Sequence, residues 1–367
     1  MGILQPIWDG TFVYQEPICF SADKDGRPTG GTLLYQPEEI LSVTSFDGSV
    51  FYQPVRDYTA NGRQLVRTEA SRIPYLERSV YCKPFTGVPE TAWVRLSGGK
   101  AYMEVVSDVY RWQTLVTYTH RDKWAGFQPE ACGESLPRSM EKLRAGGDFH
   151  LTFYGDSITA GWEASGCNER AIDMVTLGEY HVSLWHAPYQ PAWAELVTNA
   201  LQARYPQNNV IKMNRAAGGS TMQWGVEHTA ELVPPCNPDL VILGFGMNSM
   251  QESAEDYRRA ILSIIRTIRK ECHDCEFVLM SPMIPNPEIK GFQNNQLPAQ
   301  QDALYQIAEA TEGVCVAPVH SVFREMTARG KHYLELTGNC INHPNDFSVR
   351  VYAQTVLRTL GVDGSDG

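Results

Sequence analysis

Two segments that lie far apart in the sequence carry side chains suited to nucleophilic catalysis. Residues 155–159 follow the apolar run at 151–154 and place Ser157 on the turn after a predicted buried strand. Near the other end of the chain, His343 stands just before a predicted C-terminal helix. A serine hydroxyl attacks poorly unless a base takes its proton, and histidine is suited to that role. Because open α/β sheets bind ligands at the carboxyl ends of their strands, this pair predicts acyl transfer at that edge.

The elements that must position these residues are predicted from residue 148 onward as alternating strands and helices. The expected strands are residues 149–154, 209–214, 239–245, 276–281 and 313–317. The expected helices are residues 191–204, 254–271, 298–311 and 346–360, the last with Asp346 as its N-cap. Regular alternation of strand and helix implies a parallel sheet with helices on both faces.

Residues 1–121 have a different character and predict a separate β domain. Turn signals recur between short runs rich in β-branched and aromatic residues, which is typical of a β-sandwich or jelly roll. The clearest candidate strands are residues 49–52, 102–106 and 109–118. Residues 122–147 are expected to form a connector that contains a helix at 136–145. The second domain is expected to span residues 148–367.

Two further segments stand at the ends of predicted strands. Residues 214–221 have the sequence Asn-Arg-Ala-Ala-Gly-Gly-Ser-Thr and include Gly219, and Gly246-Met-Asn248 follows the next predicted strand. Together with the Gly-Asp-Ser of residues 155–157 and with His343-Pro344, these segments resemble the SGNH (GDSL-type) hydrolase superfamily in order and spacing. The resemblance covers about residues 148–360, and its strength comes from four motifs in sequence.

The resemblance implies a fold, a set of roles and a class of substrate. It implies a flavodoxin-like domain in which Ser157 is the nucleophile and His343 is its base. The implied oxyanion hole consists of the backbone N–H of Ser157, the N–H of Gly219 and the side-chain amide of Asn248. Members of this superfamily with an accessory β domain are often carbohydrate acetyl esterases. No metal or cofactor is needed for that chemistry.

The sequence departs from the family pattern at two positions. Ser249 stands where Gly-x-Asn-Asp has its aspartate, and Cys340 stands where Asp-x-x-His has its acid. The base still needs an acceptor for its Nδ1–H, which fixes the tautomer. We expect a backbone carbonyl near Asn339 or Cys340 to accept it, which would make a Ser-His dyad, with the Glu335 carboxylate as a second candidate.

The substrate is the least constrained part of the prediction. Trp162, Trp185 and Trp224 could pack on the flat faces of sugar rings, and they could equally be core residues. The favoured substrate is an acetylated plant cell-wall oligosaccharide, such as a xylo-oligosaccharide. A short-chain lipid esterase or thioesterase is an alternative. A carbohydrate-binding protein whose hydrolase site has decayed is another, because the acid is missing.

Composition excludes several other classes of function. The 367 residues carry a net charge of −11, which disfavours nucleic-acid and anionic-membrane partners. The N-terminus lacks the pattern of a signal peptide, and the nine irregularly spaced cysteines favour reduced thiols, so we expect a cytoplasmic protein. The single pair Cys272 and Cys275 leaves zinc two ligands short. A homo-oligomer is left open by the sequence.

Overall fold

The second half of the chain is built on a parallel five-stranded sheet. The computed structural model describes residues 3–23, 25–78, 94–95, 102–103, 109–289 and 292–362. The strands of this sheet are β11 (Gly147–Gly155), β14 (Asn208–Asn214), β15 (Leu240–Gly244), β16 (Glu276–Met280) and β17 (Val314–Ala317). Their order is β14-β11-β15-β16-β17, and every neighbouring pair is parallel. Numbered along the sheet's own sequence, this is the 2-1-3-4-5 order of flavodoxin-like folds.

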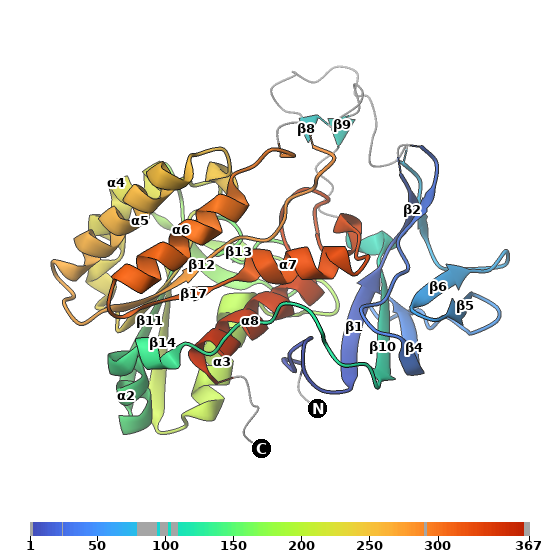
Figure 1. Ribbon diagram of the computed structural model, residues 1–367, viewed down its shortest axis with the longest axis horizontal. Helices are drawn as coiled ribbons and strands as arrows, with labels where there is room; N and C mark the ends of the chain where they lie inside the picture. Colours follow the sequence, from blue (N-terminus) through green and yellow to red (C-terminus); the bar gives the residue numbers. More distant parts are fainter. Residues whose placement is uncertain are drawn as a thin grey trace.

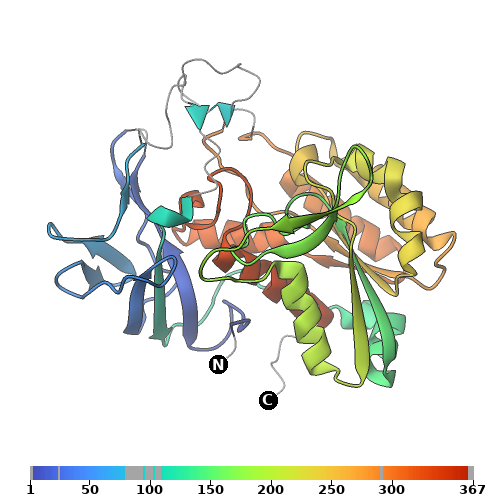
Figure 2. The ribbon, with the colours of Figure 1, turned by 180° about the vertical axis from the view of Figure 1, so that it is seen from behind.

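Helices cover both faces of this sheet (Figures 1 and 2). Successive strand residues point to opposite faces, so Phe153 and Tyr154 belong to different apolar clusters. The helices are α2 (Pro137–Ala145), α3 (Trp193–Arg204), α4 (Met222–Leu232), α5 (Ala254–Arg269), α6 (Leu297–Ala310), α7 (Val319–Ala328) and α8 (Asp346–Leu360). α4, α5 and α6 cover the face of Tyr154, whereas α2, α3, α7 and α8 share the cluster of Phe153. Within the described ranges, every helix is too short or too polar to span a lipid bilayer.

Helix α5 shows how the local sequence sets an element. Ser253 caps it by accepting a hydrogen bond from the Asp256 N–H, which is one of the unpaired donors of the first turn. Glu255 and Asp256 place negative charge at the positive end of the helix dipole. Its buried residues repeat at helical spacing and face the sheet: Tyr257, Ile261, Ile264, Ile265 and Ile268.

The structure confirms the predicted parallel sheet and its five strands, each within two residues at either end. The five predicted helices are also present, as α2, α3, α5, α6 and α8. Helices α4 and α7 were not predicted, nor was the hairpin formed by β12 (Asn168–Ile172) and β13 (Glu179–Ser183). Asp346 is not the N-cap of α8: Asn345 caps it and accepts from the Ser348 N–H.

The N-terminal part is a β domain made of small sheets, as predicted. Its largest sheet is antiparallel, with the order β1-β10-β4, so β10 is the central strand. The strands are β1 (Phe12–Ile18), β2 (Phe20–Ala22), β3 (Pro28–Thr29), β4 (Pro37–Ser45), β5 (Tyr58–Asn61), β6 (Gln64–Arg67), β7 (Tyr75–Leu76), β8 (Val94–Arg95), β9 (Tyr102–Met103) and β10 (Thr114–His120).

Three predicted strands of this domain differ in detail. Residues 109–118 divide into a 3-10 turn, Val109–Trp112, and the start of β10. Residues 49–52 form only an isolated bridge, Thr44 with Phe51. Of the strand expected at 102–106, the first two residues form β9, and residues 104–106 lie outside the described residues.

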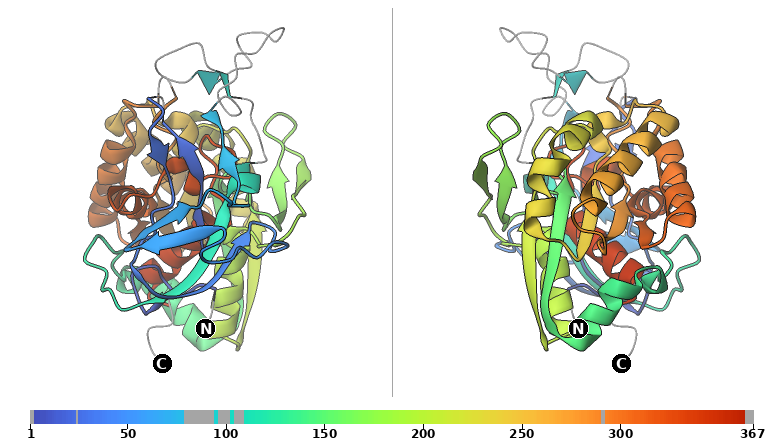
Figure 3. Two further views of the ribbon diagram at one scale, coloured as in Figure 1. Left: turned by 90° about the vertical axis from the view of Figure 1, so that its right-hand side faces the viewer. Right: turned by 90° about the vertical axis from the view of Figure 1, so that its left-hand side faces the viewer.

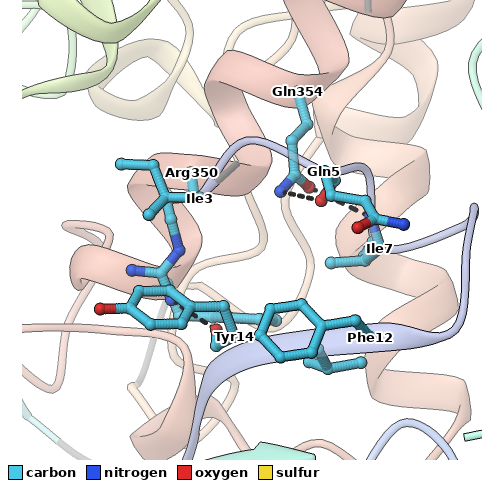
Figure 4. Close-up of a pocket in the computed structure, with 9 residues that line it drawn as sticks. Ile3, Gln5, Ile7, Phe12, Tyr14, Arg350 and Gln354 are labelled. Atoms are coloured by element: carbon cyan, nitrogen blue, oxygen red, sulfur yellow. Dashed lines mark hydrogen bonds between the residues drawn. The ribbon is translucent and has the colours of Figure 1, made fainter. Parts of the chain in front are cut away.

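The β domain packs against α8 through buried polar contacts (Figure 4). The Arg350 guanidinium donates to the carbonyl of Tyr14 and lies 5.2 Å from the Tyr14 ring centroid. One turn further along α8, Gln354 donates to the Gln5 carbonyl and accepts from the Ile7 N–H. Apolar side chains of the β domain and of α8 belong to one continuous cluster. The two parts of the chain therefore share a core.

Candidate active site

Ser157 and His343, which are 186 positions apart, meet at the carboxyl edge of the parallel sheet. Ser157 lies on the turn after β11, and His343 lies three residues before α8. The Ser157 Oγ is 2.8 Å from the His343 Nε2, which is hydrogen-bond distance. The site lies beside the β11–β15 junction, where the strand order reverses and where this fold binds ligands. The pair is arranged as a nucleophile with its base.

Two further predicted residues line the same pocket. Gly219 lies in the turn after β14 with φ +81°, a conformation that glycine adopts without strain, and a Cβ there would meet no atom within 4 Å. Asn248 follows β15, and its Nδ2 donates to the Ser220 carbonyl at 2.9 Å. Because an amide nitrogen carries two hydrogens, the second N–H can serve a ligand. Ser249, at the position of the family's aspartate, accepts from the Met222 N–H and so ties the Asn248 turn to α4.

The pocket has a volume of about 500 Å³ and combines polar and aromatic walls. Ser157 and His343 form part of its lining, together with Gly218, Gly219, Asn248 and Asn342. The rest of the lining comes from the turn after Ser157 and from the β12–β13 hairpin: Trp162, Ile172, Asp173, Met174, Val175 and Tyr180. Figure 3 shows this hairpin projecting from the body of the molecule. Among these lining residues, Trp162, Met174 and Val175 expose apolar surface.

The structure separates the three tryptophans that were considered for substrate binding. Trp162 lines the pocket, with its ring centroid 5.9 Å from that of His343. Trp185 is exposed outside this lining and packs beside Tyr189. Trp224 is buried in α4, and its Nε1 donates to the Met174 carbonyl, so it holds the tip of the β12–β13 hairpin against α4. Of the three, only Trp162 can reach a ligand beside Ser157.

The acceptor expected for the His343 Nδ1–H differs from what the structure shows. Among the described residues, this buried nitrogen has no hydrogen-bond partner. The Cys340 carbonyl accepts instead from the Asn286 side chain. The Glu335 carboxylate accepts hydrogen bonds from the backbone N–H groups of Cys19 and Gly31, and not from His343.

The carboxylate that faces His343 Nδ1 is Glu163, at 3.9 Å. Glu163 lies six residues after the nucleophile, and its side chain is only 9% exposed. Its φ of +70° is unusual for a residue with a Cβ, and such conformations cluster at functional sites. Gly338 leaves room for it, because a Cβ at that position would lie 2.8 Å from the Glu163 Cβ. Glu163 was not among the residues predicted from the sequence, where its position six residues after Ser157 was the available signal.

Two buried aspartates flank the site without pointing at the nucleophile. Asp156 accepts from the Ile158 N–H, and burial raises its pKa to about 6. Asp346 accepts from both the N–H and the hydroxyl of Ser165, which ties the start of α8 to the loop after the nucleophile. Burial also raises the pKa of Asp346 to about 6. Both carboxyls organise loops.

No group of three or more His, Cys, Asp or Glu side chains placed to hold a metal occurs within the described ranges. Of the pair considered for zinc, Cys275 is buried at the start of β16, and Cys272 lies in the preceding turn.

Comparison with solved structures finds similar folds at low sequence identity. A two-domain esterase active on acetylated mannans is 20% identical over 66% of this chain and 56% of its own, with a TM-score of 0.48. The acetylxylan esterase Axe2 from Geobacillus stearothermophilus is 20% identical over 59% of this chain and 96% of its own, with a TM-score of 0.46. The chain thus spans little more than half the length of the mannan-active esterase. At this level of similarity, neither structure supports a statement about function.

A search of curated proteins found no match. Residues 153–348, more than half of the chain, match the sequence profile of the GDSL-like Lipase/Acylhydrolase family. This range begins in β11 and ends in the first turn of α8, so it contains every residue of the pocket described above. The chain therefore belongs to the GDSL-like Lipase/Acylhydrolase family.

Proposed function

We propose that this protein is a serine esterase that removes acetyl groups from carbohydrate, with plant cell-wall oligosaccharides such as xylo-oligosaccharides as the favoured class. The observation that carries the proposal is the 2.8 Å contact between Ser157 Oγ and His343 Nε2 in an open pocket. A hydroxyl hydrogen-bonded to an imidazole is the arrangement that covalent acyl transfer requires.

In the acylation half of the reaction, Ser157 acts as the nucleophile and His343 acts first as the base and then as the acid. His343 Nε2 takes the hydroxyl proton while Ser157 Oγ bonds to the ester carbonyl carbon, giving a tetrahedral oxyanion. The N–H groups of Ser157, Gly219 and Asn248 donate to this oxyanion. When the intermediate collapses, the C–O bond to the sugar breaks, and His343 returns its proton to the leaving sugar hydroxyl. Ser157 is left as an acetyl ester.

Deacylation repeats these steps with water in place of the serine. His343 takes a proton from the water as the water oxygen attacks the acetyl carbonyl. Collapse then breaks the bond to Ser157 Oγ, which recovers the proton from His343. The products are acetate and free enzyme.

Glu163 completes the pair as the group that orients the base. At 3.9 Å from Nδ1, its carboxylate stabilises the imidazolium that forms during both steps. We therefore propose a Ser157-His343-Glu163 arrangement in place of the dyad expected from sequence.

The pocket lining supports an acetylated sugar as substrate. Trp162 and Tyr180 present ring surface on which a sugar face can pack. Asp173, Asn248 and Asn342 supply polar groups for sugar hydroxyls. A pocket volume of about 500 Å³ is large enough for a sugar that carries a short acyl group.

One observation favours the alternative of a short-chain lipid esterase or thioesterase. Met174 and Val175, at the tip of the hairpin, expose 39% and 85% of their surface beside the pocket. A longer acyl chain could pack on this apolar surface. Rates with p-nitrophenyl acetate, butyrate and octanoate separate the two functions: we expect the acetyl ester to be fastest, and a rate that rises with chain length would support the alternative.

The direct test measures acetate released from acetylated xylo-oligosaccharides. We expect the wild-type protein to release acetate, and Ser157→Ala to release none above background because the attacking oxygen is gone. If the protein hydrolyses p-nitrophenyl acetate but releases no acetate from any acetylated oligosaccharide, it is an esterase with another substrate. If turnover of every ester tested were independent of Ser157, the proposed mechanism would be refuted.

A further inference from the structure

We propose that the N-terminal β domain is part of the active-site scaffold, and that Gln113 of this domain is a positioning residue for His343. The inference rests on the proposed role of His343 as the base. It concerns residues 331–345, here called the histidine segment, which lead from α7 to α8. Nothing in the family motifs lies in the β domain, because the matched region begins at residue 153.

The histidine segment contains one short 3-10 helix, Tyr333–Glu335, and no longer helix or strand. Beside His343, the main-chain contacts are an isolated bridge between Thr337 and Pro344 and two hydrogen bonds, from the Gly338 N–H to the His343 carbonyl at 3.0 Å and from the Asn345 N–H to the Leu336 carbonyl at 3.3 Å. Asn339 Oδ1 accepts from the N–H groups of the turn that precedes His343, including that of His343 itself. These bonds leave the Leu334 and Thr337 carbonyls to be satisfied by groups from outside the segment.

Gln113 supplies three of those partners from outside the catalytic domain. Its Nε2 donates to the carbonyls of Leu334 and Thr337, at 2.7 and 2.8 Å. Its Oε1 accepts from the Asn345 side chain at 3.0 Å. These bonds join both arms of the histidine segment, one on each side of His343. Gln113 is fully buried, so water does not compete for these bonds.

Asn345 connects Gln113 to the first turn of α8 through its own hydrogen bonds. Its Nδ2 also donates to the Glu335 carbonyl, and its Oδ1 caps α8 by accepting from Ser348. Asn345 is two residues after His343, so Gln113, Asn345 and the helix N-terminus fix the backbone next to the base. A displacement of about 1 Å in a catalytic group is enough to lower turnover by about two orders of magnitude.

Gln113 is itself held by the most central strand of the β domain. It immediately precedes β10, which is paired on both sides by β1 and β4. A second buried contact joins the same two parts: the Lys331 ammonium lies 3.0 Å from Glu16 and donates to the Pro17 carbonyl. The histidine segment is thus bonded to the β domain at its beginning and around the base.

The test compares two glutamines that each join the β domain to the catalytic domain. Gln113→Ala removes the bonds around His343. Gln354→Ala removes two buried bonds of the same kind, to Gln5 and Ile7, about 12 Å along α8 from its first residue (Figure 4). Both variants should lower the melting temperature. We expect Gln113→Ala to lower kcat for p-nitrophenyl acetate at least tenfold with KM nearly unchanged, and Gln354→Ala to change kcat less than twofold.

A second readout separates this inference from the proposed substrate. The rate at which a fluorophosphonate labels Ser157 depends on alignment of serine and base, whatever ester the enzyme hydrolyses. We expect at least tenfold slower labelling in Gln113→Ala, but not in Gln354→Ala, at a temperature where both are folded. If Gln113→Ala does not fold, Gln113→Glu keeps the shape and the acceptor but loses the two donated bonds, and the same slowing is expected. Equal labelling rates in the folded Gln113 variant, Gln354→Ala and wild type would overturn the inference.

Discussion

At the scale of single residues, the reactivity of the site depends on a few donors and acceptors placed around one oxygen. In the proposed mechanism, Ser157 Oγ gains its nucleophilicity from His343 Nε2, 2.8 Å away, while Gly219 and Asn248 stabilise only the charge that forms later. These two kinds of contribution can be separated by mutation, because losing an oxyanion donor reduces the rate whereas losing the nucleophile abolishes the covalent route.

Asn248→Ala tests the oxyanion donor. We expect kcat for p-nitrophenyl acetate to fall by about 10²–10³-fold, because the second N–H of the amide no longer meets the developing charge. KM should change little, since this bond strengthens in the transition state. Steady-state kinetics against wild type and Ser157→Ala provide the comparison. A kcat within twofold of wild type would remove Asn248 from the oxyanion hole.

Glu163→Gln tests the acid that the sequence did not reveal. The amide has nearly the same shape but cannot stabilise the imidazolium, so we expect kcat to fall at least tenfold, with the about 10⁴-fold loss known for aspartate-to-asparagine changes in serine proteases as an upper limit. Glu179→Gln is a matched control, because Glu179 forms ion pairs with Arg170 and Arg215 outside the pocket lining. Equal kcat values for the two variants would show that His343 is oriented by another group.

At the scale of elements, the sequence was most informative where function sits at the end of a strand. Ser157, Gly219 and Asn248 follow three neighbouring strands, and parallel strands bring their carboxyl ends to one edge. Strands β15, β16 and β17 were predictable because their sequences are nearly continuous apolar runs, as buried parallel strands are. The amphipathic helix α5 was predictable from the helical spacing of its apolar residues.

Features that depend on contacts between elements were not predictable in this way. Glu163 reaches His343 because its backbone adopts φ +70° and because Gly338 of a distant segment leaves space. Sequence alone could not show which tryptophan faces the pocket, since this depends on the β12–β13 hairpin covering Trp224 and leaving Trp162 beside Ser157. Such arrangements are decided by tertiary packing.

The burial of the Asp346 carboxyl at the start of α8 makes stability depend on pH. Asp346 has a pKa of about 6 in the folded protein, against 3.8 as its ordinary value, so the folded state keeps a proton that the unfolded state loses between these pH values. The free energy of unfolding should therefore fall as pH rises from 4 to about 7, by up to about 3 kcal/mol from this group.

Asp346→Asn tests this contribution in urea unfolding at pH 5 and at pH 7.5. The variant has no carboxyl to titrate at this position, so its stability should change less between the two pH values than that of wild type. Asp156, whose pKa is also raised to about 6, is retained in both proteins and acts as the internal reference. An identical pH dependence in the two proteins would contradict the assignment.

At the scale of the whole molecule, the β domain and the catalytic domain are expected to unfold together. Multidomain proteins often unfold in separate steps, but here a fully buried ammonium, Lys331, links Glu16 of one domain to Glu335 of the other. Glu335 in turn accepts from the Cys19 and Gly31 N–H groups. Separating the domains would expose or unpair all of these groups at once.

Lys331→Met tests this coupling. It leaves two buried carboxylates without their cation, so we expect a loss of about 3–5 kcal/mol in the free energy of unfolding. Arg27→Met, which removes an exposed ion pair with Asp25, should cost less than about 1 kcal/mol. Urea titrations followed by near-UV circular dichroism and by esterase activity should give one coincident transition in wild type. Two separated transitions would show that the domains are independent.

The most direct test of the central claim, that Ser157 forms the acyl-enzyme, is to locate the acetyl group on the protein. Wild-type enzyme is mixed briefly with p-nitrophenyl acetate, quenched in acid, digested and examined by mass spectrometry. We predict that the peptide containing Ser157 gains the mass of one acetyl group and that fragmentation places it on this residue, while Ser157→Ala shows no such gain. Release of p-nitrophenol at the wild-type rate from Ser157→Ala, or acetylation confined to another residue, would contradict the account.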